Sequence, residues 1–307
     1  MSKDFLSMKN IPEQEINSIL NTANTMKALL KNDKKRVPHL SGKTIIMIFI
    51  QEDGPAKLSF QLASQYLMSN IADLTSAQTN STDFYNINEL GHFIEQMGGD
   101  FIVMNHPMSG SCNLLAQNVR ASVINAGDGM NENPTQALLD LMCIKKYKGG
   151  FNNLKVSVVG DILNNSVAKS SIWALNTLGA KITLCGPPTL VPRIYENLGV
   201  KITYDPYEAV DGADVIMSQS LREKEFYQQL LPSQNEYKKT YKIDEKMLAY
   251  AHSDAIVVHN GQLKRGIEVS SKVIVANHTF SEDQISNGVA LKMALLFLLA
   301  NKGGTIG

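Results

Sequence analysis

The chain has 307 residues, which is enough for two domains of ordinary size. Lys plus Arg and Asp plus Glu each number 29, so no excess of charge indicates a nucleic acid or an anionic membrane as a partner. The polar start MSKDFLSMKN predicts no signal peptide, and no apolar run approaches the ~18 residues of a membrane span. We therefore expect a cytoplasmic protein.

The three cysteines, Cys112, Cys143 and Cys185, lack the close spacing of metal ligands. Hydrophobic residues make up 44% of the chain, so a large core is available to bury such side chains. We expect buried, structural thiols in a reducing compartment.

Short apolar, β-branched runs alternate with longer amphipathic stretches from residue 44 onward. This alternation predicts parallel sheets covered by helices on both faces. The expected strands are 44–50, 100–106, 122–127, 155–161, 181–187, 200–205, 213–219, 255–260 and 273–278. Helices are expected at 134–147 and 166–179.

The Gly- and Asn-rich stretch KGGFNNL, residues 148–154, is typical of a domain boundary. We expect two doubly wound α/β domains, 1–149 and 150–286, with the active-site cleft between them. The apolar helix 287–303 is expected to pack back on the first domain. Ligands of such folds bind beyond the carboxyl ends of the strands. The segments gathered there are QEDGPAK, NHPMSG, NAGDGMNENPTQ, GDILNNS, SQSLREKE and HNGQLKRG.

Five motifs, in order, span most of the chain: LSF (58–60), MNHPMSGSCNLLA (104–116), NAGDGMNENPTQALLDL (125–141), VVGD (158–161) and HNGQLKRGIEV (259–269). Together they resemble the aspartate/ornithine carbamoyltransferase family, and its aspartate branch most closely. The resemblance implies transfer of a carbamoyl group from carbamoyl phosphate to an amine, with no metal or organic cofactor. It also implies a homotrimer in which a loop of the neighbouring subunit completes each site. Domain 1–149 would be carbamoyl-phosphate-binding-like and domain 150–286 amino-acid-binding-like.

The loop before LSF departs from the family pattern. A strand-to-helix junction is suited to bind an anion, and the family fills it with Ser-Thr-Arg-Thr-Arg. Here Glu52 is followed by Asp53, Gly54, Pro55, Ala56 and Lys57. Charged donors supply most of the affinity for a phosphate dianion, Pro55 has no N–H, and Asp53 adds a negative charge. These residues predict weak phosphate binding or none.

The carbamoyl side departs as well. Asn105 stands where the family has an Arg that polarises the carbamoyl oxygen, and Asn133 replaces a His that donates to it. His106, Thr135 and Gln136 are retained. Loss of one oxyanion donor raises the barrier by about 3 kcal/mol. Asn105, His106, Asn133 and Gln136 are the catalytic candidates, although His106 could equally cap the turn before a proline.

On the acceptor side, Ser166 and Gln219 replace the two Arg residues that bind the amino acid's carboxylate in the family. The late loop that positions substrate reads His259, Asn260, Gly261 and Gln262, and the neighbour-lent loop within 74–89 contains no Lys or Arg. The expected ligand-binding residues are Glu52, Asp53, Gly54, Pro55, Ala56, Lys57, Thr135, Ser166, Gln219, Asn260, Gly261 and Gln262.

Three functions remain open. The losses on both substrate sides favour a catalytically silent homologue with a structural or regulatory role, alone or beside a paralogous catalytic chain. A second hypothesis is a transferase or binding protein for a less anionic ligand, with an acid or base among Glu52, Asp53 and His106. The third is an active aspartate carbamoyltransferase, which forms N-carbamoyl-L-aspartate for pyrimidine biosynthesis.

Overall fold

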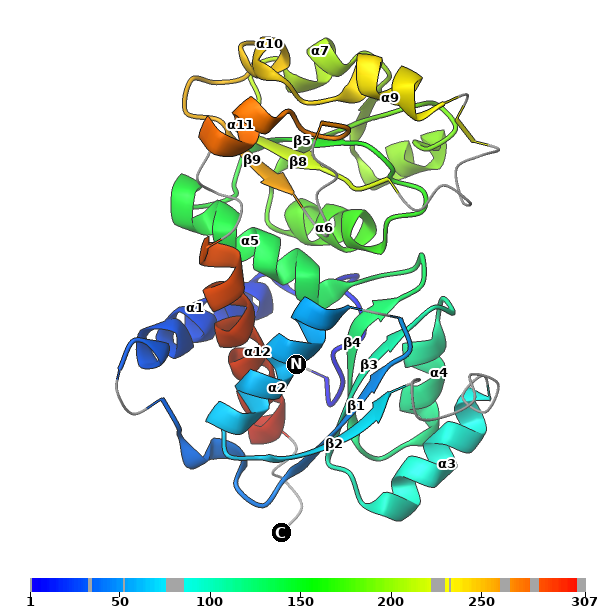
Figure 1. The fold of residues 1–307 in the computed structure, drawn as a ribbon, viewed down its shortest axis with the longest axis vertical. Coiled ribbons are helices and arrows are strands. Elements are labelled where there is room, and N and C mark those ends of the chain that lie inside the picture. The colour runs from blue at the N-terminus through cyan, green and yellow to red at the C-terminus, as the bar shows by residue number, and fades with distance from the viewer. Residues whose placement is uncertain are drawn as a thin grey trace. The chain divides into compact units, whose positions relative to one another are not determined.

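The computed structural model describes residues 2–32, 35–51, 53–75, 86–221, 230–231, 233–259, 266–276 and 282–302. The chain divides into two compact units. The first comprises Met1–Leu139 and Ile285–Gly307, and the second comprises Asp140–Gln284. Each unit is an α/β structure with its own parallel sheet, which confirms the predicted fold class (Figure 1).

The first unit contains a four-stranded sheet in the order β2-β1-β3-β4. Its strands are β1 (Thr44–Phe49), β2 (Asn70–Thr75), β3 (Phe101–His106) and β4 (Ser122–Asp128). Helices α3 (Ile87–Met97) and α4 (Ser111–Asn118) cover one face, where they bury a cluster of Ile, Leu and Val side chains with β1 and β3. Helices α1 (Glu13–Leu30), α2 (Gly54–Tyr66) and α12 (Glu282–Lys302) lie on the other face, and a short 3-10 helix spans Pro38–Leu40 (Figure 1).

The second unit contains a five-stranded parallel sheet in the order β7-β6-β5-β8-β9. Its strands are β5 (Lys155–Val159), β6 (Lys181–Cys185), β7 (Lys201–Thr203), β8 (Val215–Ser218) and β9 (Ile256–His259). One face is covered by α7 (Pro206–Val210), α9 (Gln234–Tyr241), α10 (Glu245–Leu248) and α11 (Ser271–Ala276). Helix α6 (Ser166–Thr177) lies on the other face, and 3-10 helix η3 spans Arg193–Leu198 (Figure 1). Helix α5 (Pro134–Lys148) contains the division between the units, which falls between Leu139 and Asp140.

Eight of the nine expected strands are present, with ends shifted by a few residues. The ninth, 273–278, was wrong: Ser271–Ala276 forms α11 instead. Ser270 Oγ accepts a hydrogen bond from Val273 N, which caps the helix, and Val273 is buried while Val275 is 75% exposed. Tertiary packing of one helical face has therefore outweighed the strand preference of the β-branched residues.

Strand β2, at the edge of the first sheet, was not predicted from the sequence. It pairs with β1 in parallel from Thr44 opposite Asn70 to Phe49 opposite Thr75. Its sequence, NIADLT, mixes polar and apolar residues because an edge strand is only half covered.

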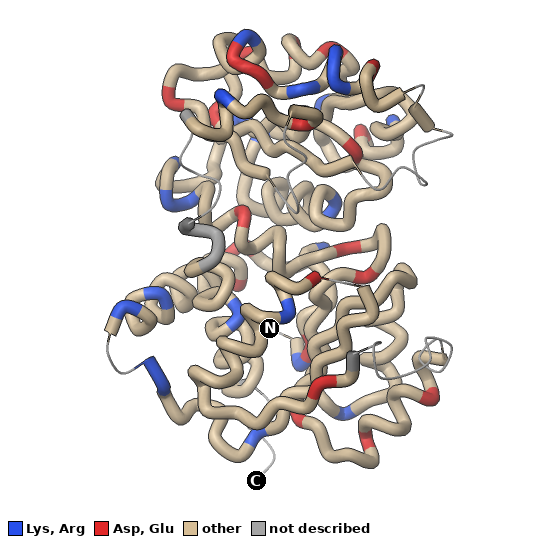
Figure 2. Tube along the Cα trace, in the orientation of Figure 1, with Lys and Arg blue, Asp and Glu red and all other residues tan. Residues whose placement is uncertain are grey.

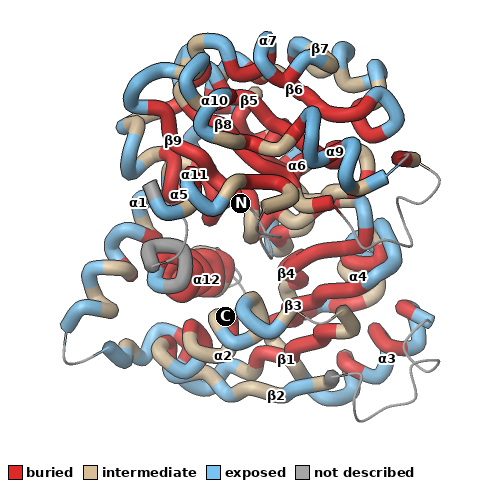
Figure 3. The backbone as a smooth tube through the Cα atoms, turned by 45° about the horizontal axis from the view of Figure 1, so that its top comes forward, coloured by how far each residue is buried: buried red, intermediate tan, exposed pale blue. Residues whose placement is uncertain are grey.

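Burial is concentrated in the strands other than β2, in α5 and in α12 (Figure 3). Every residue of α12 from Asn287 to Leu296 is buried, including Lys292. Basic and acidic residues are interspersed on the outside of both units (Figure 2). None of the helices that the structure describes combines the length and the apolar character that crossing a bilayer requires.

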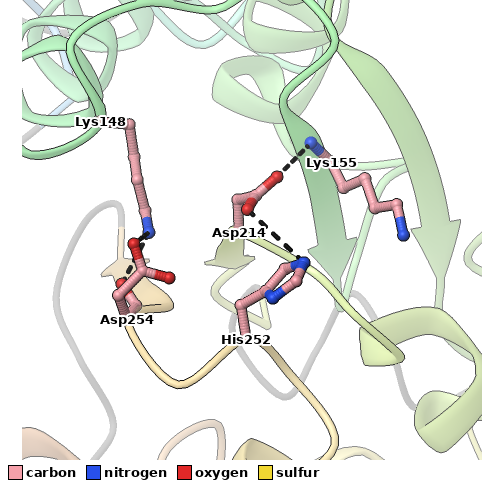
Figure 4. A network of polar contacts seen from close by, with 5 residues as sticks. All are labelled: Lys148, Lys155, Asp214, His252 and Asp254. Carbon is pink, nitrogen blue, oxygen red and sulfur yellow. Dashed lines mark hydrogen bonds and ion pairs between the residues drawn. The ribbon is translucent and has the colours of Figure 1, made fainter.

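A polar network joins segments at the amino ends of β5, β8 and β9 in the second unit (Figure 4). Lys148 Nζ lies 2.8 Å from Asp254 Oδ2 and 2.6 Å from the Asp254 carbonyl oxygen. Lys155 N donates to Asp214 Oδ2, and His252 Nε2 is 4.0 Å from Asp214 Oδ1. The hydrogen bond from Lys148 lowers the pKa of Asp254. This network fixes the end of the sheet opposite to the predicted ligand site.

The three cysteines are buried and form no disulfide, which confirms the predicted burial. Burial raises the pKa of Cys112 well above its usual value, and burial also raises the pKa of Cys185 to about 12. Because a thiolate is the reactive form, we expect a thiol reagent such as dithionitrobenzoate to label none of them in the native protein and all three in denaturant. Rapid release of one equivalent of thionitrobenzoate per chain from the native protein would contradict the burial of these thiols.

Candidate functional site

The first helix turn of α2 is capped by the chain's own carboxylate. Asp53 Oδ1 accepts a hydrogen bond of 3.0 Å from Ala56 N, which is one of the donors that an anion at this helix end would use. Gly54 and Pro55 are exposed beside it. An incoming phosphate therefore meets a negative charge at this position, while Glu52 lies outside the described residues.

Two lysines lie near this turn. Lys57 Nζ is 2.7 Å from Asp73 Oδ2, so its charge is paired on the neighbouring strand β2. Lys292, on α12, donates to Ser59 Oγ at 2.5 Å, and Ser59 Oγ in turn lies 2.8 Å from the carbonyl oxygens of Pro55 and Ala56. Burial lowers the pKa of Lys292 to about 8, against the opposing effect of the charge on Asp53. The buried ammonium group of Lys292 is thus linked through Ser59 to the backbone of the first turn of α2.

Lys292 was not among the residues predicted for the site. The signal was present, because Lys292 is a single basic residue in the middle of the apolar run VALKMALLFLL. Lysine is almost never fully buried unless its charge has a partner, so a lysine in such a run marks a specific contact.

The second segment of the first unit's site is the carboxyl end of β3. Asn105 Nδ2 donates to the Ala126 carbonyl oxygen at 3.1 Å, and the Asn105 carbonyl accepts from Ile50 N at 3.0 Å. The latter bond ties the residue after β1 to the end of β3, so the phosphate loop and Asn105 lie at one edge of the sheet. His106 Nδ1 accepts from Met108 N at 3.0 Å, as a turn cap does, and the side chain is fully buried. That bond leaves the proton of a neutral imidazole on Nε2.

The turn after β4 is organised around the buried Asp128. Its two carboxylate oxygens accept hydrogen bonds from Gly110 N, Glu132 N and the side chains of Asn125 and Asn131, at 2.9 to 3.0 Å. A Cβ on Gly129, which has φ +61°, would lie 2.4 Å from a backbone oxygen. NAGDG is therefore a scaffold that requires these residues.

The start of α5 carries the third segment. Asn133 Oδ1 accepts from Gln136 N at 3.1 Å and from Thr135 Oγ1 at 3.1 Å, so Asn133 is the N-cap and Pro134 takes the first helical position. A Cβ built on Gly127 would lie 3.1 Å from Asn105 Nδ2 and 3.2 Å from Asn133 Nδ2. The two amides that replace the family's carbamoyl-directed residues therefore meet over Gly127.

The predicted acceptor residues lie in the second unit. Ser166 is the first residue of α6, and Asn165 caps that helix by accepting from Val167 N and Ala168 N. Gln219 follows β8, is fully buried, and donates its backbone N–H to Val159 O at 2.8 Å.

His259 ends β9, beside the same edge of the second sheet. Its Nε2 is 3.7 Å from Glu268 Oε2 and 3.4 Å from Ser220 Oγ. Asn260, Gly261 and Gln262 lie outside the described residues, as does most of the loop within 74–89. In the described part of the chain, no group of three or more His, Cys, Asp or Glu residues could hold a metal ion.

Two family models match the chain. "Aspartate/ornithine carbamoyltransferase, carbamoyl-P binding domain" matches residues 3–146, and "Aspartate/ornithine carbamoyltransferase, Asp/Orn binding domain" matches residues 152–299. Two curated relatives are both named aspartate carbamoyltransferase catalytic subunit. The one from Acetivibrio thermocellus is 44% identical over 98% of this chain and 96% of its own, and the one from Ruminiclostridium cellulolyticum is 43% identical over the same shares.

Solved structures agree with this match. The catalytic subunit of M. jannaschii aspartate transcarbamoylase has a TM-score of 0.83 and 27% identity, over 99% of both chains. Ornithine carbamoyltransferase from Pyrococcus furiosus has a TM-score of 0.83 and 26% identity, over 95% of both chains.

These comparisons correct the leading functional expectation. The lost charged donors suggested a catalytically silent homologue, but full-length relatives at 40–44% identity are named catalytic subunits of an enzyme. The active-enzyme alternative is therefore better supported than the silent one.

Proposed function

This chain belongs to the aspartate/ornithine carbamoyltransferase family, and we propose that it transfers the carbamoyl group of carbamoyl phosphate to L-aspartate. The observation that carries the proposal is the 44% identity, over 98% of the chain, to a relative named aspartate carbamoyltransferase catalytic subunit. The proposed reaction is the attack of the aspartate amino nitrogen on the carbamoyl carbon. The bond from that carbon to the phosphate oxygen breaks, and phosphate leaves with the electron pair and accepts the amine proton.

In this proposal the residues 1–149 bind carbamoyl phosphate, with the helix 287–303 packed on them, and the residues 150–286 bind aspartate. The Nδ2 of Asn133 is the end of that amide able to donate to the carbamoyl oxygen, because Oδ1 caps α5. His106 supplies an Nε2–H donor. Gln136 and Thr135 lie in the first turn of α5, and Ser166 and Gln219 face the amino acid.

Neutral amides bind developing charge less strongly than arginine and histidine do. We therefore expect a higher KM for carbamoyl phosphate and a lower kcat than in relatives that keep the charged residues.

The decisive experiment measures N-carbamoyl-L-aspartate formed from carbamoyl phosphate and aspartate by the purified protein. We expect product with aspartate and much less with ornithine. The matched control is the same preparation after heat denaturation. Absence of product at millimolar concentrations of both substrates would overturn the proposal.

Asp53→Ser tests the phosphate side. Serine keeps a side-chain oxygen to cap α2 but removes the negative charge. Since two unit charges 4 Å apart in water interact by about 1 kcal/mol and phosphate carries up to two, we expect KM for carbamoyl phosphate to fall roughly tenfold. The control is Asp100→Ser, whose carboxylate also accepts one backbone N–H, from Thr44, but pairs with Lys43 at the opposite end of the strands. An equal KM for both variants and the wild type would place the phosphate elsewhere.

The assembly is proposed from the family resemblance. We propose a homotrimer whose sites are completed by a neighbouring copy, with a paralogous catalytic chain or another subunit as a further partner. Light scattering coupled to size exclusion should then give about three times the chain mass of 33.8 kDa. A monomeric mass at micromolar concentration would contradict this.

A further inference from the structure

The buried side chain of Asn105 has one end that nothing in the protein satisfies. The residue is 4% exposed, and its Nδ2 is used by the Ala126 carbonyl oxygen. That bond fixes the orientation of the amide. Within the described residues, no donor lies within hydrogen-bond distance of Oδ1. Buried acceptors are nearly always paired, and an exception is expected where a ligand provides the missing donor.

Asn105 packs against bare backbone. Gly127 has φ +126°, and a Cβ there would lie 3.1 Å from Asn105 Nδ2 and 3.2 Å from Asn133 Nδ2, so glycine lets both amides lie close to the chain. Asn105 is also bonded through its backbone carbonyl to Ile50, next to the phosphate loop. The unsatisfied oxygen is thus a neutral acceptor at the edge of the sheet where the proposed carbamoyl phosphate binds.

We propose that Asn105 Oδ1 accepts a hydrogen bond from the NH2 group of the substrate's carbamoyl moiety and so selects carbamoyl over acyl donors. The inference rests on the proposed carbamoyl transfer and adds a specificity-determining residue to it. An arginine, which the family resemblance places at this position, carries five donors and no acceptor. Asparagine therefore exchanges a contact with the carbonyl oxygen for a contact with the amide nitrogen. A methyl group in place of NH2 would leave Oδ1 buried and unpaired, which is a strong basis for rejection.

Two stable phosphonates test this directly. Phosphonoacetamide and 2-oxopropylphosphonate differ only in carrying NH2 or CH3 on the carbonyl carbon. In calorimetric titration of the wild-type protein, we expect the amide to bind at least about tenfold more tightly than the ketone, because the ketone strands a buried acceptor. A ratio near one, or no binding of either compound, overturns the assignment of Asn105.

Asn105→Leu removes the acceptor at similar volume, and the ratio should then fall to within about twofold of one because neither ligand gains a hydrogen bond. Asn113→Leu, at an exposed position on α4, is the matched control and should keep the wild-type ratio. A tenfold ratio that persists in Asn105→Leu assigns the selectivity to another residue. Even if Asn105→Leu does not fold, a wild-type ratio near one overturns the proposal. The carbamoyl-transfer assay is separate: product formation with a phosphonate ratio of one would sink this inference and leave the proposed function standing.

Discussion

Asp128→Ala should destabilise the first unit by at least about 4 kcal/mol, since four donors lose a buried, charged acceptor and each unpaired buried group costs about 1–3 kcal/mol. The donors are Gly110 N, Glu132 N, Asn125 Nδ2 and Asn131 Nδ2. Asp128 therefore joins the turn after β4 to the start of α4. At roughly 2–4 °C per kcal/mol, we expect a thermal transition lowered by about 10 °C or more.

The matched control is Asp254→Ala in the second unit. Asp254 is 76% exposed in its side chain, and Lys148 keeps its hydrogen bond to the backbone carbonyl oxygen of residue 254, so we expect only a small shift. Scanning calorimetry of both variants makes the comparison. Equal, small shifts of the thermal transition in the two variants would show that water replaces the carboxylate of Asp128. The role of Asp128 in the NAGDG turn would then be something other than stability.

Lys292→Met is expected to stabilise the protein at pH 7 by about 2–3 kcal/mol, since a lowering of the lysine pKa from 10.5 to about 8 corresponds to roughly 3 kcal/mol against the buried charge. The sign follows from proton binding. Between pH 8 and 10.5 the unfolded state holds more protons than the folded state, so the wild type gains stability as pH rises through that window. Below pH 8 both states are protonated and the destabilisation is fully present.

The advantage of the methionine variant should therefore be largest at pH 7 and should shrink towards pH 10.5. Urea denaturation at pH 7 and pH 10 measures it, with Lys31→Met, at an exposed position, as the control. A methionine variant that is less stable than the wild type at pH 7 would mean that the contacts of the ammonium with Ser59 and the Phe60 ring outweigh its burial.

The hydrophobic pattern of the sequence predicted the buried strands well, but it did not predict the edge strand β2 or the helix α11. Strands β1 and β3 are continuous apolar runs because both of their faces are covered, and such runs are readable without a structure. Strand β2 lies at an edge and α11 is set by packing of Val273, so neither has a local signal that outweighs its context.

Part of the candidate site could be predicted from the sequence. Asn133 before Pro134 and Asp53 before Gly54-Pro55 both carry the pattern of a helix N-cap, and the structure shows both caps. The hypothesis of a catalytically silent homologue was wrong, and a count of lost charged side chains leaves out the backbone N–H groups that can also bind an anion. No sequence pattern marks the orientation of the Asn105 amide, which depends on the Ala126 carbonyl from the neighbouring strand.

The first unit is built from two separate segments of the chain, and this affects the order in which the two units fold during synthesis. Asp140–Gln284 is one continuous segment, whereas the first unit also needs residues from Ile285 onward. On the ribosome, the second unit can thus complete its fold before α12 has been made, which reverses the usual order in which amino-terminal domains fold first. Until then the face of α2 that later receives Lys292 and its apolar neighbours stays uncovered. A nascent chain halted before α12 is therefore the species that most needs a chaperone.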